Sequence, residues 1–417
     1  MDKIIIKGGK GLNGSVNINS AKNAVLPIIA SCILNGEKNI IKKAPMLEDV
    51  IVLSNVLKSL NAEVNIDECK EEITIDSSNL KSIQPSDDLV RKMRASFLIM
   101  GAMLARFGEF KLSLPGGCNI GTRPIDLHLK GLAALGAEIN VGHGYVEARA
   151  KKLKGANIYL DFPSVGATEN IMMAATLAEG ETIIGNCAEE PEIEDLANCL
   201  IAMGADIKGA GTDTIKINGV KELRGVEYTP IYDRIEAGTF MIAAAITNSF
   251  ININGVKEEH LKPVIAKLIE MGVEIDIKGD MMSVDARKTL TPTDIKTMPY
   301  PGFPTDMQSQ LTSLLSITKG ISVITETIFE NRFMHVAELR RMGANIKIDG
   351  RSAIIQGVDR LTGAEVKSTD LRAGAAMILA GLVAEGETVV SDIYHIDRGY
   401  VNIEKKLQNL GADIYRI

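Results

Sequence analysis

Six stretches of the chain repeat one arrangement of apolar and polar positions. Each has apolar residues at helical spacing, then a glycine or asparagine, then alternating apolar residues. This order predicts a helix that ends in a left-handed cap and is followed by a strand. The stretches are LKSLNAEVNI, LAALGAEINV, LIAMGADIKG, LIEMGVEIDI, LRRMGANIKI and LQNLGADIYR, with cap residues Asn61, Gly136, Gly204, Gly272, Gly343 and Gly411.

A second strand-like segment precedes most of these caps by roughly 25 to 30 residues. Strand and helix therefore alternate six times, which indicates internal duplication into units that bury their apolar faces against one another. The segments are NGEKNIIKKA, FGEFKLSLPG, EGETIIGNCA, TNSFININGV, TKGISVITET and EGETVVSDIY.

The six repeats divide into two sets of three, which predicts an α/β chain with two domains. A chain of 417 residues also exceeds what one hydrophobic core usually holds. The break is expected near Glu227–Asp233, EYTPIYD, a proline-containing run between the third and fourth repeats. The first twenty residues hold the alternating stretches IIIKGG and SVNINS, which could pair as strands with either half.

Composition narrows the classes of function. The formal net charge is −7, whereas a generic nucleic-acid surface needs a broad excess of Lys and Arg. The chain opens MDKIIIKGGKGLNG without an apolar signal core, and apolar runs such as Ile171–Ala178 are well short of a membrane span. We therefore expect a cytoplasmic protein without nucleic-acid or membrane partners.

The cysteines and histidines indicate neither a disulfide framework nor a metal site. Five cysteines are widely spaced without a C-x-x-C pair, which suits reduced thiols, and five histidines are equally scattered. We expect no metal and no cofactor. These residues are Cys32, Cys69, Cys118, Cys187 and Cys199, with His128, His143, His260, His335 and His395.

Cys118 has a different setting from the other cysteines. A lone cysteine is usually a buried small hydrophobe, and the other four keep that interpretation because they lie in helix-like or strand-like segments. Cys118 instead lies among glycines in LPGGCNIGTRPIDLH, with Arg123 five residues on. This pattern predicts a loop that presents the thiol, beside an arginine that favours the thiolate or tunes proton transfer.

Several basic residues stand out from the solvated majority by the sequences around them. They come from different repeats, so a cleft between domains could collect them into a site for a polyanion such as phosphate or carboxylate. Lys22 and Asn23 open a predicted helix, whose N-terminus adds donors for an anion. The arginines are Arg94, Arg123, Arg332, Arg372 and Arg398.

Asp306 has two possible interpretations. In PYPGFPTDMQSQ it follows prolines and precedes a predicted helix, so local sequence favours a helix-capping or first-turn carboxylate. The alternative is a functional carboxylate.

At this level of detail the chain resembles the bacterial UDP-N-acetylglucosamine enolpyruvyl transferases along essentially its whole length. The most specific element is the GGCxxGxRPxDLH loop, which the related 5-enolpyruvylshikimate-3-phosphate synthases lack. The other matching segments are NSAKNAVLP, VRKMRASFLIMG, DFPSVGATENIMMAA, YPGFPTDMQSQ, ENRFMHVAELRRMGA, DLRAGAAMILAG and HIDRGYVNIEKKLQNLGA.

The resemblance implies an inverse α/β prism, in which each of two domains has three repeated units with helices inside and sheets outside. It implies a first domain of residues 22–229, and a second of residues 1–21 plus 230–417. The implied reaction transfers the enolpyruvyl group of phosphoenolpyruvate to the 3'-hydroxyl of UDP-N-acetylglucosamine and releases phosphate, which commits the sugar to peptidoglycan synthesis.

The resemblance also assigns roles by motif. Cys118 matches the loop thiol that acts as general acid or forms an adduct with phosphoenolpyruvate, and is the residue that fosfomycin modifies in the family. Asp306 matches the carboxylate at the attacking hydroxyl, and Asp370 a second acid near the reacting carbon. Lys22, Arg123 and Arg398 match ligands of phosphoenolpyruvate or departing phosphate, with Arg332 and Arg372 completing the basic cluster. The nucleotide-sugar positions are Asn23, Arg94, Arg123, Pro124, Ile125, Asp126, Leu127, Ser164, Val165, Gly166, Asp306 and Ile328.

One departure and two alternatives remain. Phe162 and Pro163 stand where many relatives have a Lys-Val pair, so no basic contact to the diphosphate is expected at Phe162. A shikimate-pathway enolpyruvyl transferase would share the repeats but lack the Cys118 loop. A catalytically silent paralogue that senses nucleotide sugars is disfavoured by the presence of the whole set of matching residues, which is Lys22, Cys118, Asp306, Asp370 and Arg398.

Overall fold

The computed structural model describes residues 2–81, 83–92, 94–114 and 125–417, and for residues 91, 92, 94 and 95 it describes the backbone only. The chain forms two compact units. The N-terminal unit runs from Ser20 to Ile231, outside residues 115–124. The C-terminal unit comprises the residues up to Asn19 together with Tyr232–Ile417.

All six predicted helix caps are confirmed. Each cap residue has a positive φ, between 71° at Asn61 and 109° at Gly204. Glycine adopts this conformation without a steric penalty and asparagine at a small one, so a local preference ends each helix at its predicted place. Each helix is followed by the predicted strand: α2 (Glu48–Ser59) by β4 (Glu63–Asp67), α5 (Asp126–Ala134) by β7 (Glu138–Gly142), α7 (Pro191–Ala202) by β11 (Asp206–Lys208), α9 (Lys262–Met271) by β15 (Glu274–Lys278), α11 (His335–Arg341) by β19 (Asn345–Asp349), and α14 (Ile403–Asn409) by β23 (Asp413–Arg416).

The second strand predicted in every repeat is also present, and a third strand joins it. The predicted strands are β3 (Lys38–Ile41), β6 (Glu109–Ser113), β10 (Glu181–Gly185), β14 (Phe250–Asn254), β18 (Ile321–Thr325) and β22 (Glu387–Ser391). In five repeats the third strand completes a hairpin with the strand after the cap: β5 (Glu72–Asp76), β8 (Tyr145–Arg149), β12 (Thr214–Asn218), β16 (Met281–Asp285) and β20 (Ser352–Gln356).

Five of the sheets in the described residues have four strands in one common pattern, and a sixth has three. The fourth strand is an edge strand that pairs in parallel with the first strand of the repeat. Burial alternates along most strands, so one face of each sheet packs inward. The edge strands are β2 (Asn13–Asn17), β9 (Asn157–Tyr159), β13 (Glu227–Tyr228), β17 (Ile295–Lys296) and β21 (Glu365–Lys367).

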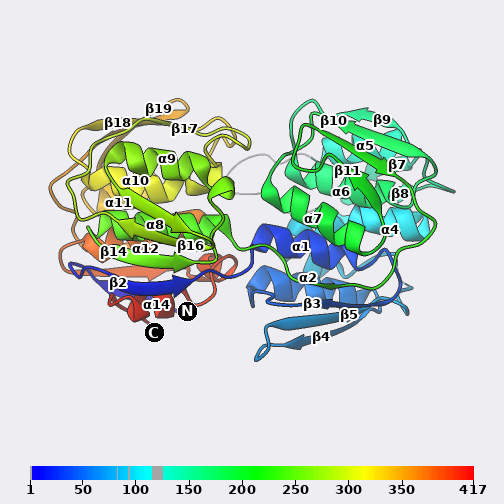
Figure 1. Cartoon of the computed structure of the whole chain (residues 1–417), viewed down its shortest axis with the longest axis horizontal. Helices are drawn as coiled ribbons and strands as arrows, with labels where there is room; N and C mark the ends of the chain where they lie inside the picture. Colours follow the sequence, from blue (N-terminus) through cyan, green and yellow to red (C-terminus); the bar gives the residue numbers. More distant parts are fainter. Residues whose placement is uncertain (1, 82, 93, 115–124) are drawn as a thin grey trace. The chain divides into compact units, whose positions relative to one another are not determined.

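The N-terminal segment lies in the C-terminal unit. β1 (Ile4–Lys7) is inserted between β22 and β23 and is antiparallel to both. β2 pairs in parallel with β14. The last sheet of the chain is therefore built from its two ends. Figure 1 shows the blue strand β2 beside β14.

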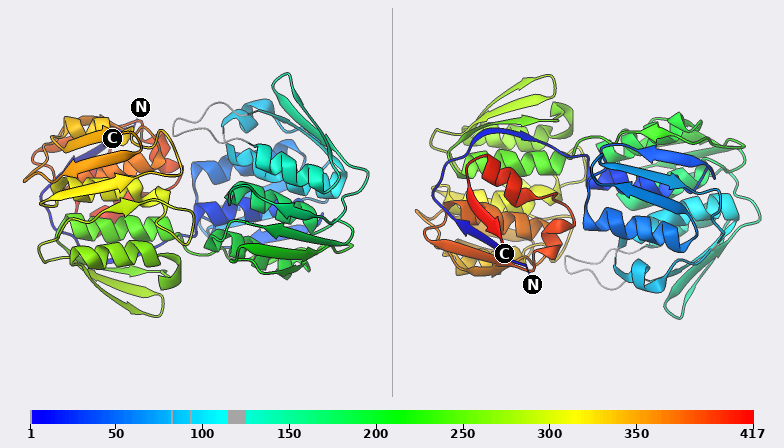
Figure 2. Two further views of the ribbon diagram at one scale, coloured as in Figure 1. Left: turned by 90° about the horizontal axis from the view of Figure 1, so that it is seen from above. Right: turned by 90° about the horizontal axis from the view of Figure 1, so that it is seen from below.

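Helices that are buried on nearly all sides fill the centre of each unit (Figure 2). In α12 (Leu371–Val383), Arg372 to Leu382 are all buried, and α8 (Arg234–Ile246) and α10 (Gln308–Ile317) are buried to a similar extent. A helix buried all round belongs inside a core, with the sheets between it and solvent. The corresponding helices of the N-terminal unit are α1 (Lys22–Ser31), α4 (Ile99–Phe107) and α6 (Val165–Ala175).

Candidate active site

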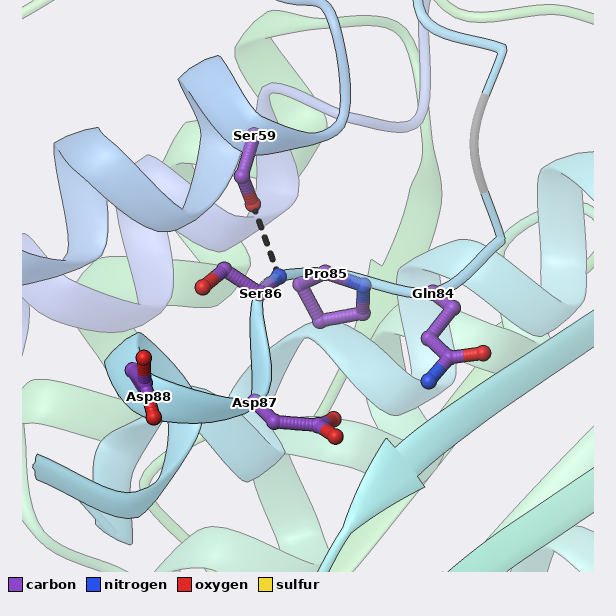
Figure 3. A pocket seen from close by; sticks show the side chains of 6 residues that line it. All are labelled: Ser59, Gln84, Pro85, Ser86, Asp87 and Asp88. Atoms are coloured by element: carbon purple, nitrogen blue, oxygen red, sulfur yellow. Dashed lines mark hydrogen bonds between the residues drawn. The ribbon is translucent and has the colours of Figure 1, made fainter.

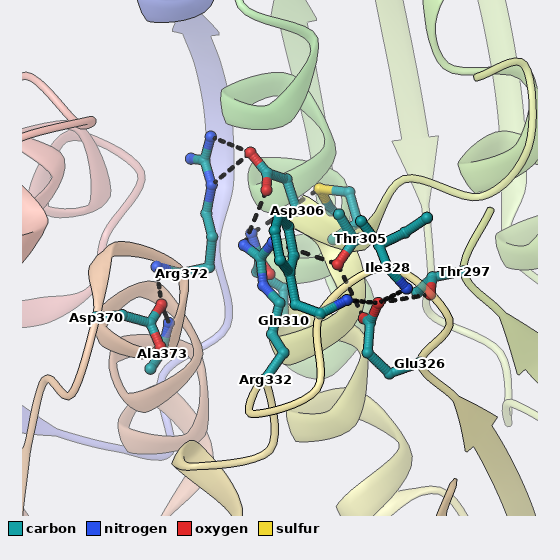
Figure 4. A network of polar contacts seen from close by, with 12 residues as sticks. Thr297, Thr305, Asp306, Gln310, Glu326, Ile328, Arg332, Asp370, Arg372 and Ala373 are labelled. Atoms are coloured by element: carbon teal, nitrogen blue, oxygen red, sulfur yellow. Dashed lines mark hydrogen bonds and ion pairs between the residues drawn. The ribbon is translucent and has the colours of Figure 1, made fainter. Parts of the chain in front are cut away.

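A carboxylate held by two buried arginines forms the centre of a polar cluster in the C-terminal unit (Figure 4). Asp306, in the 3-10 turn η3 (Thr305–Met307), accepts hydrogen bonds from Nη2 of Arg332 at 2.8 Å and from Nη2 and Nε of Arg372 at 2.9 and 3.2 Å. The arginine side chains are 3% and 4% exposed, whereas that of Asp306 is 27% exposed. The carboxylate is therefore the more accessible part of this ion-pair cluster.

The two arginines control the ionisation of Asp306. Burial alone would raise its pKa, but the charges and hydrogen bonds of Arg372 and Arg332 outweigh burial and hold the pKa well below the usual range of a carboxyl group. Asp306 is therefore ionised at neutral pH. While both arginines hold it, it accepts hydrogen bonds well and protons poorly.

Asp306 does lie in the first turn of η3, but the helix-capping interpretation is wrong, because the two arginines bind its carboxylate. α10 begins after it without a side-chain cap. The capping carboxylate is Asp370, the N-cap of α12, which accepts from the backbone N–H of Arg372 at 2.9 Å and of Ala373 at 3.0 Å. This cap places Arg372 in the first turn of α12, where it reaches Asp306.

Two histidines are close enough to Asp370 for its charge to act on them. Burial lowers the pKa of His335 to about 4, with the charge of Asp370 opposing and that of Arg332 assisting. Burial and the charge of Arg398 lower the pKa of His395, again against Asp370. Arg398 is half-buried at the C-cap of α13 (Tyr394–Asp397). The structure thus brings the predicted residues Arg332, Asp370 and Arg398 into one neighbourhood.

A second carboxylate of the C-terminal unit, Glu326, lies one hydroxyl group away from this cluster. It is 1% exposed and accepts from the hydroxyl of Thr305 at 2.8 Å and from the N–H of Ile328 at 2.8 Å. Thr305 in turn accepts from Nη1 of Arg332 at 3.2 Å. Two predicted site residues, Asp306 and Ile328, are therefore connected through a residue that the sequence did not indicate.

The predicted lysine of the N-terminal unit is paired with an aspartate. Nζ of Lys22, the first residue of α1, lies 2.5 Å from Oδ2 of Asp49, and the two side chains are 11% and 4% exposed. Asp49 belongs to the first turn of α2. Asn23 is exposed, and α1 begins without a side-chain cap. The start of α1 thus presents Asn23 beside a cation held in place by Asp49.

Asn170, in α6, connects three predicted binding segments of the N-terminal unit. Its Nδ2 donates to the carbonyl oxygens of Phe97 at 3.1 Å and Gly166 at 3.2 Å and lies 3.0 Å from Nδ1 of His128. Its Oδ1 accepts from the N–H of Gly101 at 2.8 Å. The connected segments are the 3-10 turn η1 (Arg94–Leu98) with Arg94, the start of α6 with Ser164, Val165 and Gly166, and α5 with Asp126 and Leu127.

The start of α6 has the geometry of a helix terminus that approaches another chain segment closely. Ser164 is the N-cap, and its Oγ accepts from the N–H of Ala167 at 3.4 Å. A Cβ atom at Gly166 would lie 3.0 Å from the ring of His128, so glycine permits this approach. Phe162, just before the cap, is 47% exposed.

Some predicted site residues lie outside the described part of the chain. Cys118, Arg123 and Pro124 belong to residues 115–124, and Arg94 is described only by its backbone. Ile125 is the N-cap of α5, and Asp126 is exposed in its first turn.

The four described cysteines are free thiols. Burial raises the pKa of Cys32 to about 12 and that of Cys187 to about 11, and it raises the pKa of Cys199 as well. Raised pKa values make these thiols poor nucleophiles. The expectation of a buried position is wrong for Cys69, which is exposed in the turn between β4 and β5.

An open pocket lies at the start of α3 (Asp87–Lys92) in the N-terminal unit (Figure 3). Asp87 there accepts from the hydroxyl of Tyr145 at 2.6 Å. No predicted site residue lines it, and its carboxylates do not suit an anionic substrate. The lining residues are Ser59, Gln84, Pro85, Ser86, Asp87 and Asp88.

No helix in the described part of the chain is long and apolar enough to cross a membrane. Nor do the described residues contain a group of three or more His, Cys, Asp or Glu side chains that could hold a metal ion.

Sequence reasoning missed Asp49, Glu326 and Asn170. Each is almost completely buried, and each acts on a predicted site residue through a contact formed only in the folded chain. The only available signal was indirect: a carboxylate or amide within a matching segment, such as Asn170 in ATENIMMAA.

A family model described as EPSP synthase (3-phosphoshikimate 1-carboxyvinyltransferase) matches residues 6–407. The chain is 70% identical over 417 residues to UDP-N-acetylglucosamine 1-carboxyvinyltransferase 2 of Clostridium tetani, with all of both chains covered. It is 68% identical, also over both full lengths, to UDP-N-acetylglucosamine 1-carboxyvinyltransferase 1 of Clostridium acetobutylicum.

Solved structures show the same fold. The enolpyruvyl transferase NikO from Streptomyces tendae superposes with a TM-score of 0.91 at 26% identity, covering 100% of this chain and 98% of that one. An EPSP synthase from Acinetobacter baumannii gives a TM-score of 0.78 at 21% identity, with both chains fully covered. The inverse α/β prism predicted from the sequence is thereby confirmed.

Proposed function

The chain belongs to the EPSP synthase family and, within it, to the UDP-N-acetylglucosamine 1-carboxyvinyltransferases, and we propose how its residues perform their reaction. It is a transferase of peptidoglycan synthesis that moves the enolpyruvyl group of phosphoenolpyruvate to UDP-N-acetylglucosamine. We propose that it acts in the cytoplasm, through domains bounded as the sequence predicts, at 22–229 and at 1–21 plus 230–417.

The proposed chemistry is addition followed by elimination. The 3'-oxygen of the sugar forms a bond to C2 of phosphoenolpyruvate while C3 gains a proton, which gives a tetrahedral intermediate. C3 then loses a proton, and the bond from C2 to the phosphate oxygen breaks, which releases phosphate. An acid near C3, an acceptor for the hydroxyl proton and cations for the substrate anions are required.

The observation that carries the assignment is the partly exposed Asp306 between two buried arginines. Its oxygens accept hydrogen bonds at 2.8 and 2.9 Å, so their positions are fixed. Such a carboxylate is suited to orient the sugar hydroxyl for attack, and withdrawal of either arginine toward a substrate anion would raise its pKa and make it a better base.

The other predicted residues complete the site in the same proposal. Cys118 supplies the proton or forms the adduct, and Asp370 lies near the reacting carbon. Lys22, Arg123 and Arg398 hold phosphoenolpyruvate and the leaving phosphate, with Arg332 and Arg372 completing the cluster. The nucleotide sugar contacts Asn23, Arg94, the 123–127 run, Ser164, Val165, Gly166 and Ile328.

The test of the reaction is phosphate release from phosphoenolpyruvate that depends on added UDP-N-acetylglucosamine. Release with shikimate 3-phosphate instead would favour the alternative transferase. A protein that binds the nucleotide sugar without releasing phosphate would be the silent paralogue.

Fosfomycin tests the role of Cys118. We expect the epoxide to alkylate this thiol, faster with UDP-N-acetylglucosamine present, and the Cys118→Ser variant to resist the drug and lose most activity. Cys118→Asp should resist the drug and keep measurable turnover, because a carboxylic acid still delivers a proton. Exposed Cys69 is the internal control for peptide mapping, since alkylation there in place of Cys118 would contradict the assignment.

A further inference from the structure

We infer that Glu326 is a positioning residue that holds the Asp306 turn and the Ile328 backbone in their working arrangement. The inference rests on the proposed function, which assigns Asp306 and Ile328 to the nucleotide sugar. It is carried by the hydrogen bonds of one buried carboxylate in the C-terminal unit (Figure 4).

Glu326 joins three segments that are separate in the sequence. Its Oε1 accepts from the hydroxyl of Thr297 at 2.9 Å, just after β17. The same oxygen accepts from the N–H of Ile328 at 2.8 Å and of Phe329 at 3.2 Å. Its Oε2 accepts from the hydroxyl of Thr305 at 2.8 Å. Four donors converge on it, which suits an ionised carboxylate because that group only accepts.

Thr305 transmits the effect of Glu326 to the ion-pair cluster. Its hydroxyl has one proton, which it donates to Glu326, so its lone pairs face the donor Nη1 of Arg332 at 3.2 Å. Arg332 uses its other terminal nitrogen, Nη2, for Asp306. A chain of donors thus runs from Arg332 through Thr305 to Glu326, and it fixes the guanidinium plane that holds Asp306.

Glu326 also contributes to the charge balance of the cluster formed by Asp306, Arg332 and Arg372. Two arginines form hydrogen bonds to the single carboxylate of Asp306, so this hydrogen-bonded cluster has one more positive than negative charge, although the charge of Asp233 also acts on Arg372. Glu326 supplies a second negative charge one hydroxyl group from Arg332. Such compensation lowers the cost of keeping both guanidinium groups buried beside a site for anions.

The arrangement also limits how Ile328 contacts the nucleotide sugar. Its N–H already donates to Glu326, so the contact at this position uses the carbonyl oxygen or the side chain. The N–H of Phe329, which shares a peptide plane with the Ile328 carbonyl, also donates to Glu326, so Glu326 sets the direction in which that carbonyl points.

A glutamine at position 326 separates two roles of Glu326, which are to hold the loop at Ile328 and to orient Arg332 through Thr305. A Glu326→Gln side chain can keep its carbonyl toward Thr297, Ile328 and Phe329, but its NH2 group then faces Thr305. The Thr305 oxygen would receive donors from both the amide and Arg332, with no acceptor left for its own proton. The loop stays capped while the orientation of Arg332 is disturbed.

Two threonines give a matched pair of variants. Thr305→Val and Thr297→Val each remove one hydroxyl that donates to Glu326, but only Thr305 also contacts Arg332. Glu236→Gln is the control for loss of a buried carboxylate, since Glu236 is 3% exposed in the same unit and bonds to Lys406 and Asn19.

We expect Glu326→Gln to lower kcat by about 10²-fold and Thr305→Val by about tenfold, because small displacements of catalytic groups cost this much. Thr297→Val and Glu236→Gln should change kcat less than about threefold. This holds even if they lower the melting temperature as much as Glu326→Gln and Thr305→Val do. A Thr297→Val loss as large as that of Thr305→Val, or a Glu326→Gln enzyme with normal kcat, would overturn the inference.

A crystal structure of the Glu326→Gln variant provides a readout other than turnover. We expect the contact from Arg332 Nη1 to position 305 to be lost and the loop at Ile328 to be kept. An unchanged Arg332 would contradict the inference even in a protein without transferase activity, whereas an inactive unmodified protein would contradict only the proposed function.

Discussion

The two units hold their predicted site residues by different physical means. In the C-terminal unit, Asp306 is fixed by buried arginines, and a second carboxylate, Glu326, orients one of them. In the N-terminal unit, neutral Asn170 fixes three backbone segments, and Lys22 is paired with Asp49. The difference indicates that the predicted site residues of the C-terminal unit depend on charge balance and those of the N-terminal unit on hydrogen-bond geometry.

The sharpest test of this comparison is Asp306→Asn. The change leaves two buried guanidinium groups without their carboxylate, so we expect a loss of about 3 kcal/mol in the free energy of unfolding and of about 10²-fold or more in turnover. Urea denaturation and phosphate release measure the two effects. The control is Asp285→Asn, which removes the partner of exposed Arg287 in the same unit and should cost less than about 1 kcal/mol. Equal losses in both variants would show that burial of the arginines does not matter.

The corresponding change in the N-terminal unit is Asn170→Ala, and its expected effect is smaller. It leaves the N–H of Gly101 and the carbonyl of Phe97 without the amide, which costs about 1 to 3 kcal/mol. We expect the KM for UDP-N-acetylglucosamine to rise more than kcat falls. Asn218→Ala removes an exposed amide that donates to Asp206, and it should change stability by less than about 0.5 kcal/mol. A kcat effect as large as that of Asp306→Asn would remove the distinction between the units.

The smallest expected effect concerns pH. Burial, together with the charges of Glu192 and Glu190, raises the pKa of Glu169 well above its usual value. A carboxyl group with a raised folded-state pKa binds a proton on folding, so it lowers stability as pH rises through and above its unfolded pKa. The effect of pH on stability is opposite for Asp306. Its pKa is lowered in the folded protein, so the stability that it contributes is lost as pH falls below the usual carboxyl range.

Glu169→Gln should therefore stabilise the protein by about 1 kcal/mol at pH 8 and by less near pH 5. Thermal melts across this range measure the difference, with Glu236→Gln as a second buried carboxylate whose pKa is raised despite Lys406. A pH profile identical to that of the unmodified protein would mean that Glu169 keeps an ordinary pKa.

Structural features that depend on neighbouring residues could be predicted from the sequence. Features that depend on contacts with residues distant in the sequence could not. Positive φ at Gly136 or Gly411 follows from the preference of glycine and from the helix before it, so all six caps were predictable. The same local reasoning made Asp306 a helix-capping or first-turn carboxylate, of which only the first-turn position is confirmed. It could not weigh Arg332 and Arg372, which reach that carboxylate from 26 and 66 residues away.

The site residues divide along the same line. Some site residues could be assigned from the sequence because they lie in segments that resemble family motifs, among them Lys22, Asp370 and Arg372. Glu326 and Asn170 act by holding other segments, and no local pattern marks a residue for the number of donors that converge on it after folding. Distances and burial were needed to find them.

The placement of β1 between β22 and β23 has a consequence for synthesis on the ribosome. The N-terminal unit is formed from Ser20 to Ile231, so its residues emerge early and it can fold while translation continues. The C-terminal unit must keep Ile4–Lys7, among the first residues made, unpaired in their sheet until β22 is made, and the second edge of β1 is paired only when β23 appears. Lys3 and Ile417 then exchange two backbone hydrogen bonds, at 2.9 and 3.0 Å, so the oldest and newest parts of the nascent chain close that sheet together.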